Sequence, residues 1–349
     1  MTLPEALRHQ AESCRALGSP FMGQLLDMLA ENWPADSALA QKFDTFEGDI
    51  GPAGHSLPLR LAGGLHALVL TRRAPALAAV YPPHTPRTEA LRDAVLDAIT
   101  THAAFLLDWT SRPPQTNEVR RSAALIAGAR VAVSQFDLPI CLSELGASAG
   151  LNLMWDHYAL EIAGTRIGSP MPAITLTPDW KGPMPPARVP RIAERAGVDL
   201  NPLDAGRSDH LLRLTAYLWP DQPERLSLTR AAASVTRVEI AKGDAIDWLG
   251  GRLAHAPEGH LHLIQHSVAW QYFPPAAQAH GRRLIEASGA RATRKRPLGW
   301  LAMESDGDTG GKKGAALTLR LWPGDIALSL GRADFHGRWI DWNPQSLRP

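Results

Sequence analysis

The stretch 138–152 holds the residues whose types and spacing could do chemistry. Its apolar run ends at Glu144, Gly146 and Gly150 follow with small residues between them, and a helical pattern then continues through Tyr158. A buried strand, a tight turn and a helix start form the place where α/β proteins bind nucleotides. Glycine lets backbone and ligand approach closely, and an acid at a strand end can accept hydrogen bonds from an ammonium or hydroxyl group.

The spacing of these small residues fits three kinds of site. A dinucleotide site needs G-x-G-x-x-G, and the chain fits it poorly because Ser148 follows Gly146 where a glycine is needed. The run from Gly146 to Gly150 matches the G-x-S-x-G nucleophile elbow of serine hydrolases in full. The same run after Glu144 also reads as E-x-G-x-x-x-G. That is the first motif of class I S-adenosylmethionine (SAM) methyltransferases, with Ser148 replacing the middle glycine.

The segments before the motif argue against an elbow. An elbow serine of an α/β-hydrolase follows several strands and an oxyanion-hole loop. Here Gly63-Gly64 precedes His66, but it lies in a helical-looking segment. Apolar residues at three- and four-residue spacing predict helices over 4–17, 20–33, 57–71, 87–109 and 117–135. We therefore expect residues 1–135 to form a helical N-terminal domain and the strand at 138–144 to be the first of its sheet.

From residue 136 onward the pattern alternates between strands and helices. Predicted strands cover 197–199, 261–267 and 298–304, and a strand followed by a turn covers 238–245. Predicted helices cover 211–219, 224–235, 245–253 and 275–287, and a hairpin covers 316–331. Serial strand–helix units indicate a parallel, doubly wound sheet, to which the hairpin adds antiparallel edge strands. The Pro- and Gly-rich region 160–195 is expected to be an irregular insertion or lid. The expected fold is α/β, with a Rossmann-like domain over 136–349.

Several strings along the chain resemble a bacterial family catalogued as a domain of unknown function. They are Thr116-Asn117-Glu118, Arg121–Leu125, Glu144–Asn152, Gly197–Asp204, Trp219–Gln222 and His266-Ser267. The resemblance covers nearly the whole chain. The family looks like a relative of class I SAM-dependent methyltransferases with an added helical N-terminal region. The resemblance implies a methyltransferase-type Rossmann sheet and brings no proven reaction with it.

Composition sets the class of protein. At 349 residues, 45% of them apolar, the chain can hold one large domain or two ordinary ones. A net charge of +1 gives no electrostatic case for a nucleic-acid partner. Cys14 and Cys141 are expected to be free thiols in a reducing, cytoplasmic setting. The charged first twenty residues lack an apolar core, and the longest uncharged stretch, 259–281, contains histidines and prolines, so we expect no signal peptide and no membrane span.

Two further acids are expected to bind the adenosine part of SAM. Asp199 ends a short apolar run and is preferred as the ribose acid over Glu161, which lies near the usual spacing but in an apparent hairpin with Gly164. Asp244 resembles the methyltransferase acid that accepts from the adenine N6 amine, with the backbone amide of Ala245 beside it. The alternative for both acids is a helix or turn cap.

The strand at 261–267 is expected to bring polar side chains to the reacting groups. Gln265 would contact the cofactor, and His266 could act as a base because its unperturbed pKa is about 6.5. Tyr272 lies just beyond, facing the methyl group or the substrate. The alternative for His266 is a hydrogen-bonded structural histidine. His262 shares a strand face with it, but no spacing of a metal site accompanies them, so we expect no metal.

The start of the helix at 117–135 has two interpretations. Thr116 or Asn117 as an N-cap, Glu118 near the helix dipole and an ion pair between Glu118 and Arg121 explain it fully as a helix start. The functional interpretation places this cluster against the cofactor as a domain-closing contact.

These patterns together predict a SAM-dependent methyltransferase that acts on an unidentified small molecule. Glu144, Gly146, Ser148 and Gly150 would contact the cofactor. One alternative is a serine hydrolase, in which Asp308 and His336 complete a triad with Ser148 in the chain order of α/β-hydrolases. The other is a non-catalytic nucleotide-binding protein that keeps the fold and lacks the reaction. We expect neither a nucleic-acid nor a membrane partner.

Overall fold

The computed structural model describes residues 1–51, 54–255, 257–307 and 314–347, and the chain divides into two compact units. Unit 1 comprises Met1–Thr116 and Ser208–Ser227, and unit 2 comprises Asn117–Arg207 and Leu228–Pro349. This division differs from the boundary expected at residue 135, because the helix after Thr116 packs on the sheet of unit 2. Hydrophobic periodicity identifies a helix but not the surface that it covers.

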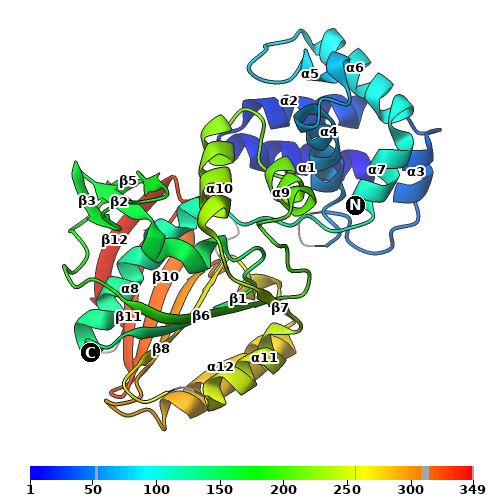
Figure 1. Cartoon of the computed structure of the whole chain (residues 1–349). Coiled ribbons are helices and arrows are strands. Elements are labelled where there is room, and N and C mark those ends of the chain that lie inside the picture. Colours follow the sequence, from blue (N-terminus) through cyan, green and yellow to red (C-terminus); the bar gives the residue numbers. More distant parts are fainter. Residues whose placement is uncertain (52–53, 256, 308–313, 348–349) are drawn as a thin grey trace. The chain divides into compact units, whose positions relative to one another are not determined.

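The elements of unit 1 in its described residues are helices (Figure 1). They are α1 (Leu3–Ala16), α2 (Pro20–Glu31), α3 (Ala38–Phe43), α4 (Leu57–Leu70), α5 (Pro75–Ala78), α6 (Thr88–Thr101), α7 (Ala103–Thr110) and α9 (Ser208–Ala216), with the first residues of α10 (Pro223–Val235). Thr2 and Glu5 form a capping box at the start of α1. The single helix expected over 87–109 is interrupted at His102, which ends α6 and precedes α7.

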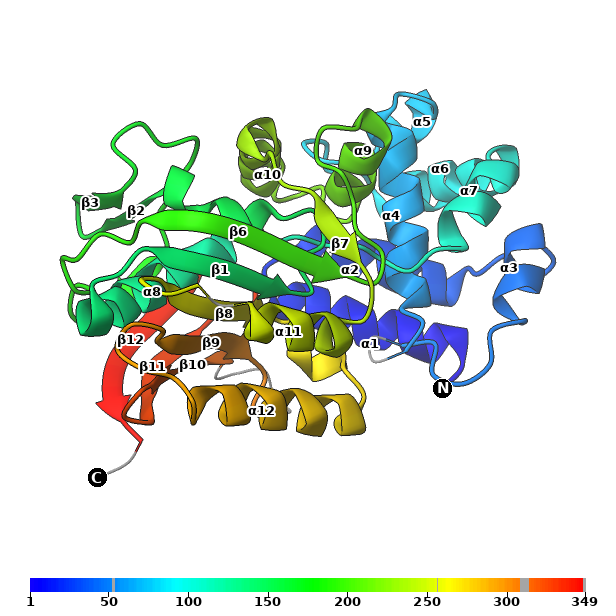
Figure 2. The same cartoon turned by 60° about the horizontal axis from the view of Figure 1, so that its bottom comes forward.

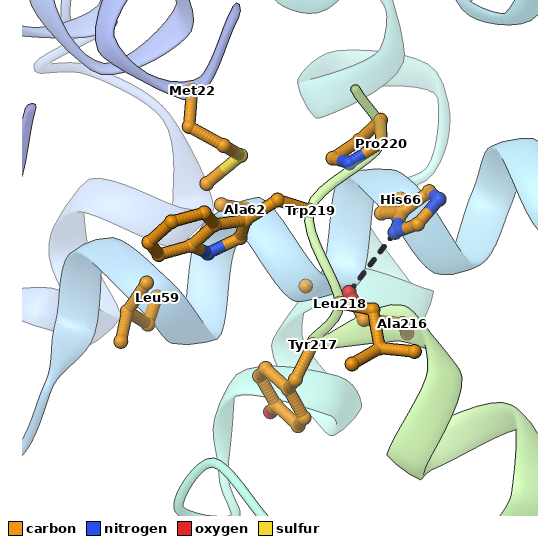
Figure 3. Close-up of a pocket in the computed structure, with 10 residues that line it drawn as sticks. Met22, Leu59, Ala62, His66, Ala216, Tyr217, Leu218, Trp219 and Pro220 are labelled. Atoms are coloured by element: carbon orange, nitrogen blue, oxygen red, sulfur yellow. Dashed lines mark hydrogen bonds between the residues drawn. The ribbon is translucent and has the colours of Figure 1, made fainter. Parts of the chain in front are cut away.

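The segment 208–227 belongs to unit 1 although it is distant in sequence from the other helices. Asp221 accepts hydrogen bonds from the Ser19 hydroxyl at 2.6 Å and the Phe21 amide at 3.0 Å, at the start of α2. The Nδ1 atom of His66 on α4 donates to the carbonyl of Ala216 at 3.1 Å (Figure 3). These contacts tie the segment to α2 and α4, and local sequence patterns contain no sign of them.

Unit 2 contains a nine-stranded sheet in its described residues, in the order β5-β12-β11-β10-β9-β8-β1-β6-β7 (Figures 1 and 2). Its strands are β1 (Ile140–Leu145), β5 (Asp179–Lys181), β6 (Ile192–Asp199), β7 (Ile240–Lys242), β8 (Leu261–Ser267), β9 (Leu298–Glu304), β10 (Ala315–Trp322), β11 (Ile326–Ala333) and β12 (Trp339–Ser346). The neighbouring strands β7, β6, β1, β8 and β9 are parallel to one another. The strands β9, β10, β11 and β12 pair in antiparallel fashion, and β5 pairs with β12 in parallel. The protein is therefore a mixed α/β protein with a large, mostly parallel central sheet.

Strand β1 is the first strand in the chain and lies between β6 and β8. All of its side chains are buried. The chain passes from β1 to β6 on one side and later to β8 on the other, so the strand order reverses at β1. In open α/β sheets, ligands bind at the carboxyl ends of the strands beside such a reversal.

The segment after β1 differs from the expected helix because it is a short 3-10 helix, η2 (Leu151–His157). The carbonyl oxygens that an α-helix would use internally are taken by side chains. Tyr158 donates to the Leu151 carbonyl at 2.7 Å, Gln265 to the Asn152 carbonyl at 3.2 Å and Arg195 to the Leu153 carbonyl at 2.8 Å. These bonds come from residues whose proximity a helical pattern does not reveal.

The region 160–195 is more regular than expected. It contributes to a three-stranded sheet within the described residues, in the order β3-β2-β4. The strands are β2 (Ala159–Ile162), β3 (Thr165–Gly168) and β4 (Thr175–Leu176). Ala163 and Gly164, with φ of 49° and 77°, form the two-residue turn between β2 and β3. The hairpin suggested by Gly164 is therefore present, and Pro-rich composition alone did not identify the remaining strands.

Helices cover both faces of the large sheet. They are α8 (Ser122–Phe136), α11 (Ala245–Ala254) and α12 (Pro275–Gly289). Neighbouring residues of a strand point to opposite faces. On β9, Leu301 lies against Gly128 of α8, whereas Trp300 lies in a buried apolar cluster with Ile246 of α11 and Ile285 of α12. The α8 face and the α11–α12 face therefore present different side chains of the same strands.

Both cysteines are buried free thiols, Cys14 on α1 and Cys141 on β1. In the part of the chain that the structure describes, none of the helices combines the length and the apolar character needed to cross a membrane.

Candidate functional site

The turn after β1 has left-handed backbone at three positions. Gly146, Ser148 and Gly150 have φ of 69°, 53° and 75°, which glycine adopts freely and serine only with strain. A Cβ on Gly146 would lie 2.5 Å from the Cβ of Ala269, and one on Gly150 would lie 2.7 Å from Val238. The glycines therefore permit close packing inside the protein.

The amide groups of this turn are bonded to the neighbouring strand β6. The N–H groups of Gly146 and Ala147 both donate to the carbonyl of Val198 at 3.0 Å. The N–H of Ser148 donates to Asp199 Oδ2 at 2.9 Å. The turn is held against the end of β6, and these three amides have protein partners, unlike the amides of a phosphate-binding loop.

Glu144 is the buried acid at the end of β1. Its side chain is 2% exposed, and its Oε2 atom has no hydrogen-bond partner among the described residues. Burial raises the pKa of the carboxyl to about 8; a hydrogen bond with the Gln265 side chain and the charge of Arg121 oppose this rise, and the charge of Asp199 adds to it. Glu144 is therefore mostly a neutral carboxylic acid at pH 7. Most buried polar groups have partners, so this oxygen, unpaired among the described residues, is an exception.

Gln265 on β8 lies on the same face of the sheet as Glu144 but is fully engaged within the protein. Its Oε1 accepts from the indole of Trp155 at 3.0 Å, and its Nε2 donates to the carbonyl of Asn152 at 3.2 Å. The Ser122 hydroxyl donates to Asn152 Oδ1 at 2.7 Å. The amide that was expected to contact the cofactor therefore fixes η2 against β8.

Asn117 and Arg121 join the start of α8 to the carboxyl edge of the sheet. Asn117 Oδ1 accepts from the amides of Ala149 at 3.3 Å and Leu151 at 2.9 Å, inside the turn after β1. Arg121 donates to the carbonyl of Ser267 at the end of β8, at 3.1 Å. The cluster that was interpreted either as a helix start or as a closing contact therefore supports the turn within unit 2.

Asp199 and Asp244 follow Glu144 along the same edge, at the ends of β6 and β7. Asp199 Oδ1 accepts from the Asn201 amide at 2.8 Å, so both of its oxygens bond to backbone amides. Asp244 Oδ1 caps α11 by accepting from the amides of Ile246 at 2.8 Å and Asp247 at 3.1 Å. Both acids therefore act as caps, as the alternative interpretation expected. The Oδ2 atom of Asp244 takes part in neither of the two bonds that cap α11.

The remaining cofactor candidates lie in different surroundings. Ala245 is the first residue of α11 and packs in the apolar cluster beneath the sheet. Glu161 is exposed on β2, opposite Arg166 in the small sheet. Of the two proposed ribose acids, only Asp199 therefore lies at the carboxyl edge of the large sheet.

His266 is held on both sides of its ring. The indole N–H of Trp300 can only donate, and it donates to His266 Nε2 at 2.8 Å, so the proton of the neutral ring is on Nδ1. Nδ1 in turn donates to Glu304 Oε1 at 2.8 Å, and the ring stacks on Trp270 at 5.0 Å. Neither nitrogen is left to take a proton from a substrate. These contacts match the structural alternative for His266.

Glu304 is a candidate functional residue that the sequence patterns did not single out. Burial alone would raise its pKa, but the hydrogen bond from His266 and the amides of Ala269 and Trp270 hold the pKa below its usual value. The carboxylate thereby caps the 3-10 turn η3 (Trp270–Tyr272). Tyr272 ends that turn with 63% of its surface exposed. Its side chain is therefore accessible, and no hydrogen bond to it from another described residue would activate it.

A second buried polar cluster lies on the α11–α12 face. His262 Nε2 accepts from the Ser143 hydroxyl at 2.9 Å, and Arg252 donates to the same hydroxyl oxygen at 3.2 Å. Burial and the Arg252 charge lower the pKa of His262 to about 4, so the ring is neutral. The described residues include no group of three or more His, Cys, Asp or Glu side chains placed to hold a metal ion.

The hydrolase alternative requires a histidine bonded to Ser148. The Ser148 hydroxyl is buried and has no hydrogen-bond partner among the described residues. A nucleophile elbow exposes its serine and places a histidine in reach of it. Asp308, the acid of that interpretation, lies outside the described residues.

Fold and site together define an α/β protein with acids and a glycine-bounded turn at the carboxyl ends of the parallel strands of a mixed sheet. The family described as "Uncharacterized protein conserved in bacteria (DUF2332)" matches residues 4–342. The chain belongs to this family, as its strings had suggested. No curated protein and no solved structure matches it, so no relative supports the likeness to methyltransferases.

Proposed function

We propose that unit 2 binds SAM at the carboxyl edge of β1 and that the protein is a methyltransferase for a small molecule. The observation that carries the proposal is the buried Oε2 of Glu144, on the strand where the order reverses, which has no hydrogen-bond partner within the described part of the chain. The parallel order β7-β6-β1-β8-β9 also supports it, since numbering these strands along the chain gives 3-2-1-4-5, the order of Rossmann sheets. In this proposal unit 2 is the methyltransferase-type domain and the helices of unit 1 are its addition.

The residues at this edge fit SAM through their acids. The ammonium of its amino-acid end suits Glu144 once that carboxyl has lost its proton, and the adenine amine suits Asp244 Oδ2, which the helix cap does not use. Gly146 offers no open cradle, because the space that a Cβ would occupy is filled by Ala269. The fit therefore rests on charge and hydrogen bonding rather than on a glycine-lined surface.

SAM supplies an activated methyl group, so the chain itself contributes mainly position. Holding the acceptor in line with the methyl group is enough for an acceptor that is already a nucleophile. A hydroxyl acceptor would also need a base, and His266 has no nitrogen available for that role. We therefore expect an amine or thiolate acceptor.

Titration calorimetry with SAM and S-adenosylhomocysteine tests the proposal. Glu144→Gln removes the charge that would meet the ammonium group, and Asp244→Asn keeps a good N-cap but replaces one accepting oxygen. Each variant should bind SAM about ten- to a hundredfold more weakly, as expected for one charge-assisted hydrogen bond. Glu161→Gln, an equivalent change on the exposed face of β2, should bind like the parent.

The proposal is wrong if the parent protein binds neither compound. It also fails if Glu144→Gln and Glu161→Gln bind SAM equally well. Binding by the parent without methyl transfer to any amine or thiol would favour the non-catalytic nucleotide-binding alternative.

The Ser148→Gly variant distinguishes the methyltransferase proposal from the serine hydrolase alternative. Glycine suits the φ of 53° at this position, and its introduction removes a hydroxyl that has no protein partner. We expect the variant to bind SAM like the parent, and we expect no labelling of the parent by a fluorophosphonate probe. Stoichiometric labelling that disappears in Ser148→Gly, read by mass spectrometry, would establish the hydrolase instead.

A further inference from the structure

Unit 1 contains a pocket of about 440 Å³. It lies among the start of α1, the loop after α2, helix α3 and the residues that follow α3 (Figure 1). Its lining includes three aromatic rings and one acid, which are Trp33, Phe43, Phe46 and Asp44. Sites for small molecules measure roughly 300–1,000 Å³ and combine apolar walls with a few polar groups. This space, called the aromatic pocket below, has the size and the lining of such a site.

The three rings of the aromatic pocket contact one another. Trp33 stacks on Phe43 with the ring centroids 5.6 Å apart, and Phe46 meets Phe43 edge to face at 6.3 Å. Phe43 is buried, whereas Trp33 and Phe46 are only partly buried. A ligand that covers these two rings removes more apolar surface from water, which favours binding. The rings therefore suit a ligand with an apolar or aromatic body.

Asp44 supplies the charge of the aromatic pocket. Among the described residues that line the pocket, it alone has an ionisable side chain. Its carboxylate forms neither a hydrogen bond nor an ion pair with another described residue. Asp44 directly follows the last residue of α3, and a negative charge at the C-terminus of a helix is unfavourable. The helix end therefore gives no reason for an acid at this position.

The segment that forms most of the pocket wall is negatively charged. Residues 31–49 contain five acids and one base, and all five acids are exposed. None of these acids forms an ion pair with a described residue. The base, Lys42, donates a hydrogen bond to the carbonyl of Leu107 at 2.7 Å. A surface of one sign attracts ligands of the opposite sign, so the charge around the aromatic pocket favours a cation.

An aromatic wall and a carboxylate together complement an organic ammonium ion. Cations are attracted to the faces of aromatic rings, and tryptophan attracts them most strongly. The Arg60 guanidinium already lies 5.2 Å from the Phe46 ring centroid, whereas no described cation lies over Trp33. We propose that the aromatic pocket binds a small organic ammonium ion, whose apolar body lies against the rings and whose charge meets Asp44.

This proposal does not rest on the SAM proposal, because the aromatic pocket lies within unit 1 and the acids of the candidate SAM site lie within unit 2. Thermal unfolding of the full chain without SAM tests it. The probes are phenethylamine, phenethyl alcohol and hydrocinnamate, at pH 7 and matched ionic strength. They share an aromatic ring and a short chain, and they carry a positive, no and a negative charge.

A ligand that binds the folded state raises Tm with saturable concentration dependence. We expect phenethylamine to do so and to bind about fivefold more tightly than phenethyl alcohol, because only the amine gains the cation–π contact and the ion pair. Hydrocinnamate should bind more weakly than the alcohol, since its charge is repelled by Asp44.

Asp44→Asn is the informative variant. Because the Asp44 side chain has no partner among the described residues, its replacement should leave the stability without probe unchanged or slightly higher. The affinity for phenethylamine, read from the concentration dependence of Tm, should fall about two- to fivefold, as expected for an exposed ion pair. The affinity for phenethyl alcohol should stay that of the parent.

Asp36→Asn provides the matched control. Asp36 is an exposed acid of the same wall segment, but it is not among the residues that line the aromatic pocket. The variant makes the same change in net charge and should keep the affinity of the parent for phenethylamine. The inference is overturned if phenethylamine gives no saturable rise in Tm, or if the alcohol binds as tightly as the amine. It is also overturned if Asp44→Asn keeps the full affinity, or if both variants lose it equally.

Discussion

Glu144→Gln should stabilise the protein at neutral pH. The carboxyl is completely buried, and its pKa rises from 4.5 to about 8 on folding. Between these two values the folded state binds the proton that the unfolded state has lost, so folding becomes less favourable as pH rises. At pH 7 the cost is roughly 3 kcal/mol. Glutamine is neutral at every pH and avoids this cost.

The pH dependence distinguishes this effect from ordinary changes in packing. Urea unfolding of the parent and of Glu144→Gln should give nearly equal stabilities at pH 4.5. The difference should grow by up to about 1.4 kcal/mol per pH unit until it levels off above pH 8. Glu161→Gln, exposed on β2, should show no such growth. A difference between the parent and Glu144→Gln that is the same at pH 5 and pH 8 would mean that Glu144 is ionised when folded.

The same variant links stability to function. It should gain stability at pH 7 while it loses affinity for SAM, because a buried acid with one unpaired oxygen costs stability and serves only when a ligand is bound. Such an exchange of stability for binding is common at functional sites. An acid that was merely structural would weaken the protein when replaced.

The sequence could predict elements whose signals are local. The apolar run before Glu144 gave strand β1, and the position of Asp199 at a strand end followed from the short apolar run before it. Asp244 was recognised as an alternative N-cap from its residue type alone. These features depend on neighbours within one helical turn or one strand, which is the range over which periodicity and capping act.

Contacts between distant segments could not be predicted. The bond between His266 and Glu304 spans 38 residues, and that between Trp155 and Gln265 spans 110. Each decides whether a polar side chain serves the fold or is available to a ligand. These pairs form because particular segments lie next to each other in the fold. A single sequence shows which side chains of a strand point to the same face, but it does not show which strand lies beside it.

Gly146→Ala should destabilise unit 2 by several kcal/mol. The left-handed backbone at this position, with a φ of 69°, costs about 1–2 kcal/mol for a residue with a Cβ. The new methyl group would also lie 2.5 Å from the Cβ of Ala269, and such overpacking adds about 1–3 kcal/mol.

Gly164→Ala is the matched control for this prediction. Gly164 has a φ of 77° in the turn between β2 and β3, and among the described residues no heavy atom beyond its two chain neighbours lies within 4 Å of the place of its Cβ. Alanine at position 164 introduces the backbone strain without the collision, so Gly164→Ala should lose only the stability that the left-handed backbone costs. Chemical denaturation measures the free energy of unfolding that each variant loses. The difference between the two losses is the cost of placing a methyl group at position 146 against Ala269. Equal losses in the two variants would mean that Ala269 moves aside, which would leave the turn after β1 with space for a ligand.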